Sequence, residues 1–234
     1  MADRNVIGGI AVAGGVGLLC NYLYNKYSEK GVQLIDNYQQ CVRAVDILRK
    51  HCNDVPVVGF DCEWVHEGAV SVLQLCSHEG YCAVIRLCKI ENLPRSLCDL
   101  LKDRKVVKVG VGTARDCTFL EACGLPTRSA LDLRFVAKLT GENAQNLAAM
   151  YMDVVGGTLT KSFSLSCSDW EAYKLTPQQV QYAADDAIAG IEIYKTLAKK
   201  VSNVNVFEKY YDMDYKPNIH NALESVASNQ CCVQ

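Results

Sequence analysis

The chain has 234 residues, a net charge of −2 and 50% hydrophobic residues. This length suits one domain of ordinary size with terminal extensions, and the near-neutral charge excludes a generic polyanion-binding protein. Any nucleic-acid contact must therefore come from a local basic patch. The thirteen cysteines include no Cys-x-x-Cys pair and no zinc-finger spacing. We interpret them as free thiols in a reducing compartment, with a disulfide-bonded secreted protein as the alternative.

The N-terminus carries a long uncharged segment. Residues 6–24 contain small and apolar residues without a charge, close to the ~20 residues that a membrane span needs. A cleaved signal peptide is the alternative, but it requires a basic start and a small-residue cleavage site. Here Asp3 offsets Arg4, and Asn-Tyr-Leu-Tyr follows the apolar run. We therefore expect residues 1–30 to form an uncleaved membrane anchor and its flank.

Two further features bear on the membrane. Lys26 and Lys30 follow the anchor, which favours a cytosolic position for the rest of the chain. A moderately hydrophobic, lysine-flanked anchor favours the mitochondrial outer membrane, with the endoplasmic reticulum as the alternative. The C-terminal Cys231-Cys-Val-Gln has the form of a prenylation signal, although no polybasic stretch precedes it. A lipid on Cys231 would be a second tether, and a chance match is the alternative.

The chain between these ends alternates between strand and helix patterns. Strands are predicted at 31–34, 57–64, 69–76, 81–87, 106–111 and 130–133, and helices at 38–51, 94–102, 115–123 and 176–200. A three-strand meander followed by alternating helices and strands predicts an α/β domain with a mixed sheet over residues 31–202. The pattern weakens after Asn203, so residues 203–234 are predicted to be a loosely ordered tail.

The predicted strand at 57–64 ends in two carboxylates. Side chains alternate along a strand, so Asp61 and Glu63 should point to one face of the sheet and Cys62 to the other. Two adjacent carboxylates repel each other, and this repulsion requires a shared proton or a bound divalent cation. The alternative is a pair of solvated acids in a loop after the strand.

Two more acidic positions follow later in the chain. Asp116 lies just past a buried strand, at the start of a helix, and Asp186 lies in the last long helix. Tyr182 is four residues before Asp186, so the two share one helical face, whereas Asp185 is rotated away by about 100°. The alternatives are a solvated acid at Asp186 and a core ring with a hydrated hydroxyl at Tyr182.

This order of motifs is Asp-x-Glu on a strand, Asp after a later strand, and Tyr-x-x-x-Asp on a C-terminal helix. It resembles the DEDD superfamily of 3′–5′ exonucleases, in the tyrosine-containing branch. Within that branch the chain is most similar to the Werner-type domains and to a membrane-anchored group among them. The resemblance covers residues 55–199 and also rests on motifs at 59–64, 108–112, 130–133, 161–162, 167–170 and 175–176.

The resemblance implies an RNase H-like fold and a metal-dependent reaction. Asp61, Glu63, Asp116 and Asp186 would hold two divalent ions, Mg²⁺ or Mn²⁺, and Tyr182 would orient the attacking water. Two such ions stabilise both the attacking hydroxide and the leaving oxygen of a phosphodiester. Hard cations prefer oxygen ligands, which explains carboxylates rather than thiols. The implied function is hydrolysis at the 3′ end of single-stranded DNA or RNA.

Two positions depart from the family pattern. Ser166 stands where relatives commonly carry Arg, and this change would weaken phosphate contacts. Gly110-Val-Gly112 replaces the Asn that precedes the Asp of the second motif, as in the Werner-type branch. Neither change touches an expected metal ligand, so we expect catalysis to be retained.

Candidate nucleic-acid contacts are Trp64, Lys108 and Lys161. Lys108 also belongs to a basic run, residues 102–108, whose alternative interpretation is a solvated helix end and turn. Trp64 could equally fill a core or rim position. Discrimination between DNA and RNA depends on 2′-hydroxyl contacts, which the sequence does not place.

Two other functions remain open at the level of sequence. A non-catalytic nucleic-acid-binding or scaffold protein could retain the same fold, and a small-molecule phosphodiesterase could use the same site. Metal binding separates the first of these from an exonuclease. The oligomeric state is not indicated by the sequence.

Overall fold

The computed structural model describes residues 29–66 and 68–216. The strands are β1 (Gly31–Ile35), β2 (Val57–Trp64), β3 (Val70–Ser77), β4 (Tyr81–Ile85), β5 (Val107–Gly110) and β6 (Ala130–Asp132). The helices are α2 (Tyr38–Cys52), α3 (Arg95–Lys102), α4 (Thr113–Ala122), α5 (Leu133–Leu139), α6 (Leu147–Val155), α7 (Phe163–Ser166) and α8 (Pro177–Ala198). Two 3₁₀ turns, η1 (Leu87–Lys89) and η2 (Val204–Tyr210), complete the described elements.

The predicted membrane features lie outside the described residues. These are the anchor at residues 6–24 and the prenylation signal at Cys231. Within residues 29–66 and 68–216, no helix has both the length and the apolar character of a membrane span. The cysteines of these ranges are all free thiols, as predicted.

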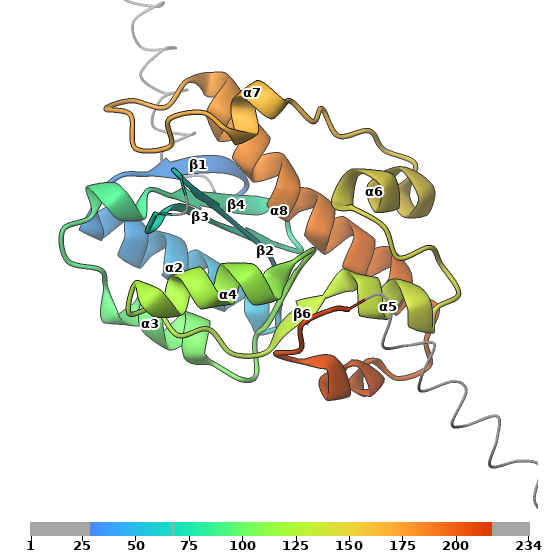
Figure 1. The fold of residues 1–234 in the computed structure, drawn as a ribbon. Helices are drawn as coiled ribbons and strands as arrows, with labels where there is room; N and C mark the ends of the chain where they lie inside the picture. The colour runs from blue at the N-terminus through green and yellow to red at the C-terminus, as the bar shows by residue number, and fades with distance from the viewer. Residues whose placement is uncertain (1–28, 67, 217–234) are drawn as a thin grey trace, which may run out of the picture.

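The strands form one mixed sheet in the order β1-β4-β3-β2-β5-β6 (Figure 1). Strands β2, β3 and β4 are antiparallel neighbours, which is the predicted meander. β1 pairs in parallel with β4, while β5 pairs in parallel with both β2 and β6. Because β2 and β5 run in the same direction, their carboxyl ends meet at one edge of the sheet.

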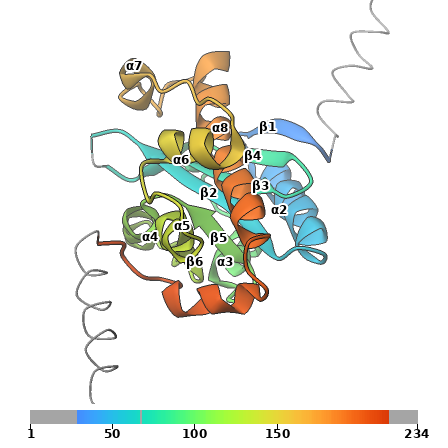
Figure 2. The same ribbon diagram turned by 90° about the vertical axis from the view of Figure 1, so that its right-hand side faces the viewer.

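Two hydrophobic clusters cover the two faces of the sheet. Figure 2 shows the sheet and its helices in a second view. Adjacent residues of β2 belong to opposite clusters, as Val57 and Val58 do, because side chains alternate along a strand. Helices α5, α6 and α8 contribute to the cluster of Val57, and helices α2, α3 and α4 to that of Val58. Asp61 and Glu63 share the parity of Val57, so their side chains face the side that α8 covers.

Helix α8 lies unusually close to the sheet because two glycines leave room for it. A Cβ atom at Gly59 of β2 would lie 1.9 Å from the carbonyl oxygen of Ala187, and one at Gly190 would lie 3.0 Å from that of Val109. The helix begins at a capping box, in which the amide of Gln179 donates to the Thr176 hydroxyl at 3.2 Å. This cap and these glycines fix where α8 crosses β2.

The C-terminal segment differs from its prediction. Phe207 is fully buried and its ring lies 6.1 Å from that of Tyr194, while Tyr210 stacks on Phe135 with ring centroids 4.8 Å apart. Tyr215 is also buried. The prediction of a loosely ordered tail is therefore wrong for residues 203–216. Three of their aromatic residues, Phe207, Tyr210 and Tyr215, fill places in the core.

Candidate active site

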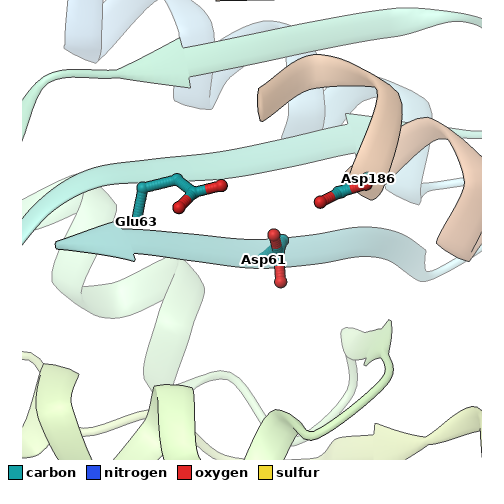
Figure 3. Close-up of side chains that lie close together, drawn as sticks. All are labelled: Asp61, Glu63 and Asp186. Atoms are coloured by element: carbon teal, nitrogen blue, oxygen red, sulfur yellow. The ribbon is translucent and has the colours of Figure 1, made fainter. Parts of the chain in front are cut away.

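Three carboxylates from distant parts of the chain meet above β2. The carboxylate oxygens of Asp61, Glu63 and Asp186 lie within 4.8 Å of one another. Figure 3 shows Asp61 and Glu63 rising from one strand while Asp186 approaches them from α8. The family resemblance implied this meeting, and the alternation of the strand predicted that Asp61 and Glu63 share one direction. Cys62 points into the opposite cluster, also as predicted.

Asp116 stands beside this group of three acids. It lies in the first turn of α4 and is only 5% exposed. The tight turn before α4 brings it there: Gly112 adopts φ +83°, and a Cβ atom at Gly110 would lie 2.4 Å from the carbonyl oxygen of Phe60. After burial, the charge of Asp116 is the largest cause that raises the pKa of Asp61.

Burial raises the pKa values of all four acids, and neighbouring carboxylates add to the effect. Loss of contact with water and the charge of Asp186 raise the pKa of Glu63 to about 8. Burial likewise raises the pKa of Asp116 to about 8, although the Arg115 guanidinium acts in the opposite direction. Asp61 and Asp186 are also shifted upward, chiefly by burial. Bound protons would relieve the repulsion in such a site, and divalent cations would relieve it more strongly because they carry a greater charge.

The donor atoms of this site suit a hard divalent cation. All of them are carboxylate oxygens, which Mg²⁺ and Mn²⁺ prefer, and no thiol belongs to the group. Oxygens within 4.8 Å of one another can bind one ion without a change in backbone position. The residues present therefore fit the metal that the family resemblance implied.

Tyr182 lies on the same face of α8 as Asp186. Its pKa is raised by burial and by the charges of Asp186, Glu63 and Asp61, so the phenol stays protonated at neutral pH. Its ring lies 6.2 Å from that of Trp170. A protonated phenol can donate a hydrogen bond but cannot remove a proton, which fits the predicted orienting role.

The neighbouring acid, Asp185, is directed elsewhere. It accepts a hydrogen bond from the Gln181 amide at 2.6 Å, on the outer side of α8. The predicted rotation between the two adjacent acids therefore separates one site residue from one surface residue.

The three candidate nucleic-acid contacts have different surroundings. Lys161 forms an ion pair with Asp186 at the site. Trp64 stacks on Phe119 with ring centroids 4.6 Å apart, and the Arg115 guanidinium lies 5.1 Å from its ring. Trp64 therefore has a packed position at the end of β2.

Lys108 lies inside the protein. It is 0% exposed, and its ammonium donates to the carbonyl oxygens of Asp103, Val106 and Arg128 at 2.8–2.9 Å. All three donors are used, so none is left for a phosphate. The structure does not support the predicted contact between Lys108 and nucleic acid.

Asp132 lies in the motif at 130–133 and was not predicted as a site residue, but it supports the site. Its carboxylate accepts hydrogen bonds from the Gly112 amide at 2.8 Å and from the Arg134 amide at 3.0 Å. Asp132 thereby caps α5 and connects this helix to the turn before α4. Its charge also raises the pKa of Asp116 in α4. The signal in the sequence was an Asp at a strand end before an unrecognised short helix.

Comparison with known proteins identifies the class. Residues 32–202, most of the chain, match the family of 3′–5′ exonucleases. The chain therefore belongs to the 3′–5′ exonuclease family. Exonuclease 3′-5′ domain-containing protein 2 of Drosophila melanogaster is 37% identical over 208 residues, which are 80% of this chain and 36% of that protein. The chain thus spans about a third of the length of this relative.

Two solved structures are also similar to this chain. The exonuclease domain of EXD2, in a crystal soaked in Mn, is 35% identical, with coverage of 76% of this chain and 94% of that domain and a TM-score of 0.46. RNase D of Escherichia coli, an exoribonuclease involved in structured RNA processing, is 24% identical over 73% of this chain and 45% of its own, with a TM-score of 0.62. The likeness to RNase D shows a shared fold, the mixed sheet with flanking helices expected of an RNase H-like exonuclease.

Proposed function

We propose that this protein removes nucleotides from the 3′ end of single-stranded DNA or RNA by a reaction that requires two divalent ions. The observation that carries the proposal is the group formed by Asp61, Glu63 and Asp186, whose oxygens lie within 4.8 Å. Asp116 stands beside it with a raised pKa. The chain encloses more negative charge here than it neutralises, in a family that acts on nucleic-acid ends.

Divalent metal ions are the cofactors of this family. Crystals of the EXD2 exonuclease domain were soaked in Mn, in Mg, and with the nucleotides GMP and dGMP. We infer that Mn²⁺ and Mg²⁺ are the ions to test on this chain, and that ribose and deoxyribose ends are both candidate substrates. Asp61, Glu63, Asp116 and Asp186 would hold the ions.

The bound ions would lower the pKa of the attacking water and neutralise the leaving oxygen. Around them, the side chains of this protein do the positioning. Asp186 and Tyr182 share one face of α8, so the phenol lies beside the carboxylate that anchors the metal. Because the phenol stays protonated, it would donate a hydrogen bond and fix the direction of the attacking water.

A digestion experiment with end-labelled strands tests the proposal. Matched DNA and RNA oligonucleotides, labelled at the 5′ or the 3′ end, would be incubated with the purified protein and Mn²⁺ or Mg²⁺. A 3′–5′ exonuclease shortens the 5′-labelled strand stepwise and releases the 3′ label as a mononucleotide at once. Asp61→Asn serves as the inactive control.

Other outcomes would redirect the assignment. Internal cuts, or loss of the 5′ label first, would contradict the proposed direction. No metal-dependent cleavage of any strand, together with little heat on Mn²⁺ titration, would favour the non-catalytic scaffold. Rapid hydrolysis of a small phosphodiester without strand cleavage would favour the small-molecule alternative.

A further inference from the structure

Lys161 is a positively charged residue within the acidic site. Its ammonium forms an ion pair with Oδ1 of Asp186 and lies 5.2 Å from the centre of the Tyr182 ring. Its side chain is 37% exposed, whereas that of its partner Asp186 is 9% exposed. One end of this ion pair is therefore fixed in the core, and the other end lies at the surface.

The charge of Lys161 acts on more than its direct partner. It lowers the pKa values of Asp61 and Glu63 as well as that of Asp186, against the upward effect of burial. One ammonium thus offsets part of the repulsion among three carboxylates. A divalent ion would do the same with a larger charge and shorter contacts.

The segment that carries Lys161 has no buried residue, although the side-chain amide of Gln179 on α8 donates to Ser168 and Asp169 at its end. Among residues 156–169, which include α7, every residue is at least partly exposed. In contrast, α8 carries eleven buried residues, including Asp186. Movement of Lys161 away from Asp186 therefore costs little packing, while movement of Asp186 would disturb the core.

We propose that Lys161 is the counter-cation of the metal-free site and that a metal ion bound by Asp186 displaces it. This inference rests on the proposed function, because it assumes a metal at these acids. The single negative charge of the Asp186 carboxylate cannot neutralise an ammonium and a dication at the same time. The two cations would also repel each other. Lys161 and the metal therefore compete, and Lys161 sets the metal concentration at which the site fills.

The displaced ammonium gains a second role from its position. It stays beside the site on an exposed segment, where it can pair with a phosphate of the substrate. Lys161 would thus exchange one anionic partner for another as the enzyme is loaded. Removing it should tighten metal binding and weaken the use of substrate, whereas removal of a structural residue would weaken both.

Calorimetric titration of Mn²⁺ into the purified protein at pH 8.0 tests the inference. Lys161→Met should bind Mn²⁺ at least about fivefold more tightly than the wild type, the lower end of typical coupling between two competing sites. Lys161→Arg should bind like the wild type, because it keeps the charge. Lys174→Met, at an exposed lysine away from the acids, is the matched control and should also bind like the wild type.

The possible results separate this inference from the proposed function. If the wild type binds no Mn²⁺, the proposed function itself fails. If the wild type binds Mn²⁺ and Lys161→Met binds it equally or more weakly, only the competition is overturned. Should Lys161→Met fold poorly, Lys161→Gln replaces it. The measurement is then the rise in melting temperature caused by Mn²⁺, which should be larger for Lys161→Gln than for the wild type.

Discussion

Two regions of this protein hold charged groups away from water, and they differ in how far the protein itself satisfies those charges. At the start of β5, the ammonium of Lys108 is fully buried and donates to three backbone carbonyls. Near the other end of the same strand pair, Asp61, Glu63 and Asp186 crowd together, with Lys161 as a partly exposed counter-charge. Both regions shift pKa values: burial lowers the pKa of Lys108 to about 8 and raises that of Glu63 to about 8.

The difference lies in whether the chain itself satisfies the buried charge. Lys108 has an acceptor for each of its donors, so its site is complete and its role is structural. Among the described residues, Lys161 pairs with Asp186, yet the acids still repel one another, so we infer that an outside cation completes their site. Completeness of hydrogen bonding thus separates a structural from a functional buried charge here.

Removing a carboxylate from the acidic site should have the greatest effect on activity. Asp186→Asn should lower 3′-end cleavage by about a thousandfold or more, because a metal ligand supplies several kcal/mol of transition-state stabilisation. Asp185→Asn is the matched control, since Asp185 contacts Gln181 instead of the site. Single-turnover cleavage of a labelled strand measures both. Equal loss in the two variants would contradict the assignment of one acid to the site.

Replacing the buried Lys108 should lower the stability of the protein and leave metal binding at the acidic site unchanged. Lys108→Met leaves three buried carbonyls without a donor and should lower the free energy of unfolding by about 3 kcal/mol. Denaturant unfolding measures the loss, and Mn²⁺ affinity of the folded variant should match that of the wild type. A variant with normal stability and weak nucleic-acid binding would reverse the structural assignment.

The close approach of α8 to β2 links the two regions. In Gly59→Ala the added Cβ would lie 1.9 Å from the Ala187 carbonyl oxygen, so α8 must shift outward. We expect a loss of about 2–3 kcal/mol in stability together with reduced cleavage, because Asp186 moves with the helix. Gly124→Ala is a comparison with strained backbone but open space, at φ +78°. It should cost less stability and spare cleavage.

The smallest effect concerns pH in the absence of metal. The pKa values of Glu63 and Asp116 are about 8 when folded, against ordinary values of 4.5 and 3.8. Between these values the folded protein binds more protons than the unfolded chain, so stability falls as pH rises from about 5 to about 7.5.

Melting temperatures measured across this range in EDTA should therefore decrease by a few degrees. Glu63→Gln should show a smaller decrease, and Mn²⁺ should raise the melting temperature most at the high-pH end. A wild-type slope equal to that of Glu63→Gln would contradict the raised pKa.

Many elements of the fold and the directions of individual acids followed from local patterns, whereas the family resemblance implied that the acids meet. The alternation of β2 predicted the shared direction of Asp61 and Glu63, and the capping box predicted the start of α8. Helical periodicity separated Asp186 from Asp185. These features depend on period and end signals, which a sequence carries directly.

The remaining features depend on tertiary contacts that no local pattern encodes. The basic run that contains Lys108 gave no sign that three backbone carbonyls from two separate segments enclose this lysine. Helices α5, α6 and α7 are short, and η2 is anchored by single aromatic rings such as Phe207. The pair between Lys161 and Asp186 joins positions 25 residues apart. Each of these required the folded arrangement.

We infer that a cation from outside the chain completes the acidic group. The most direct test is the anomalous scattering of Mn²⁺ in crystals of the protein grown or soaked with this ion. We expect Mn²⁺ within about 2.0–2.6 Å of carboxylate oxygens of Asp61, Glu63 and Asp186, with Lys161 no longer paired to Asp186. Crystals that show no Mn²⁺ at these acids, while Lys161 keeps its ion pair, would contradict it.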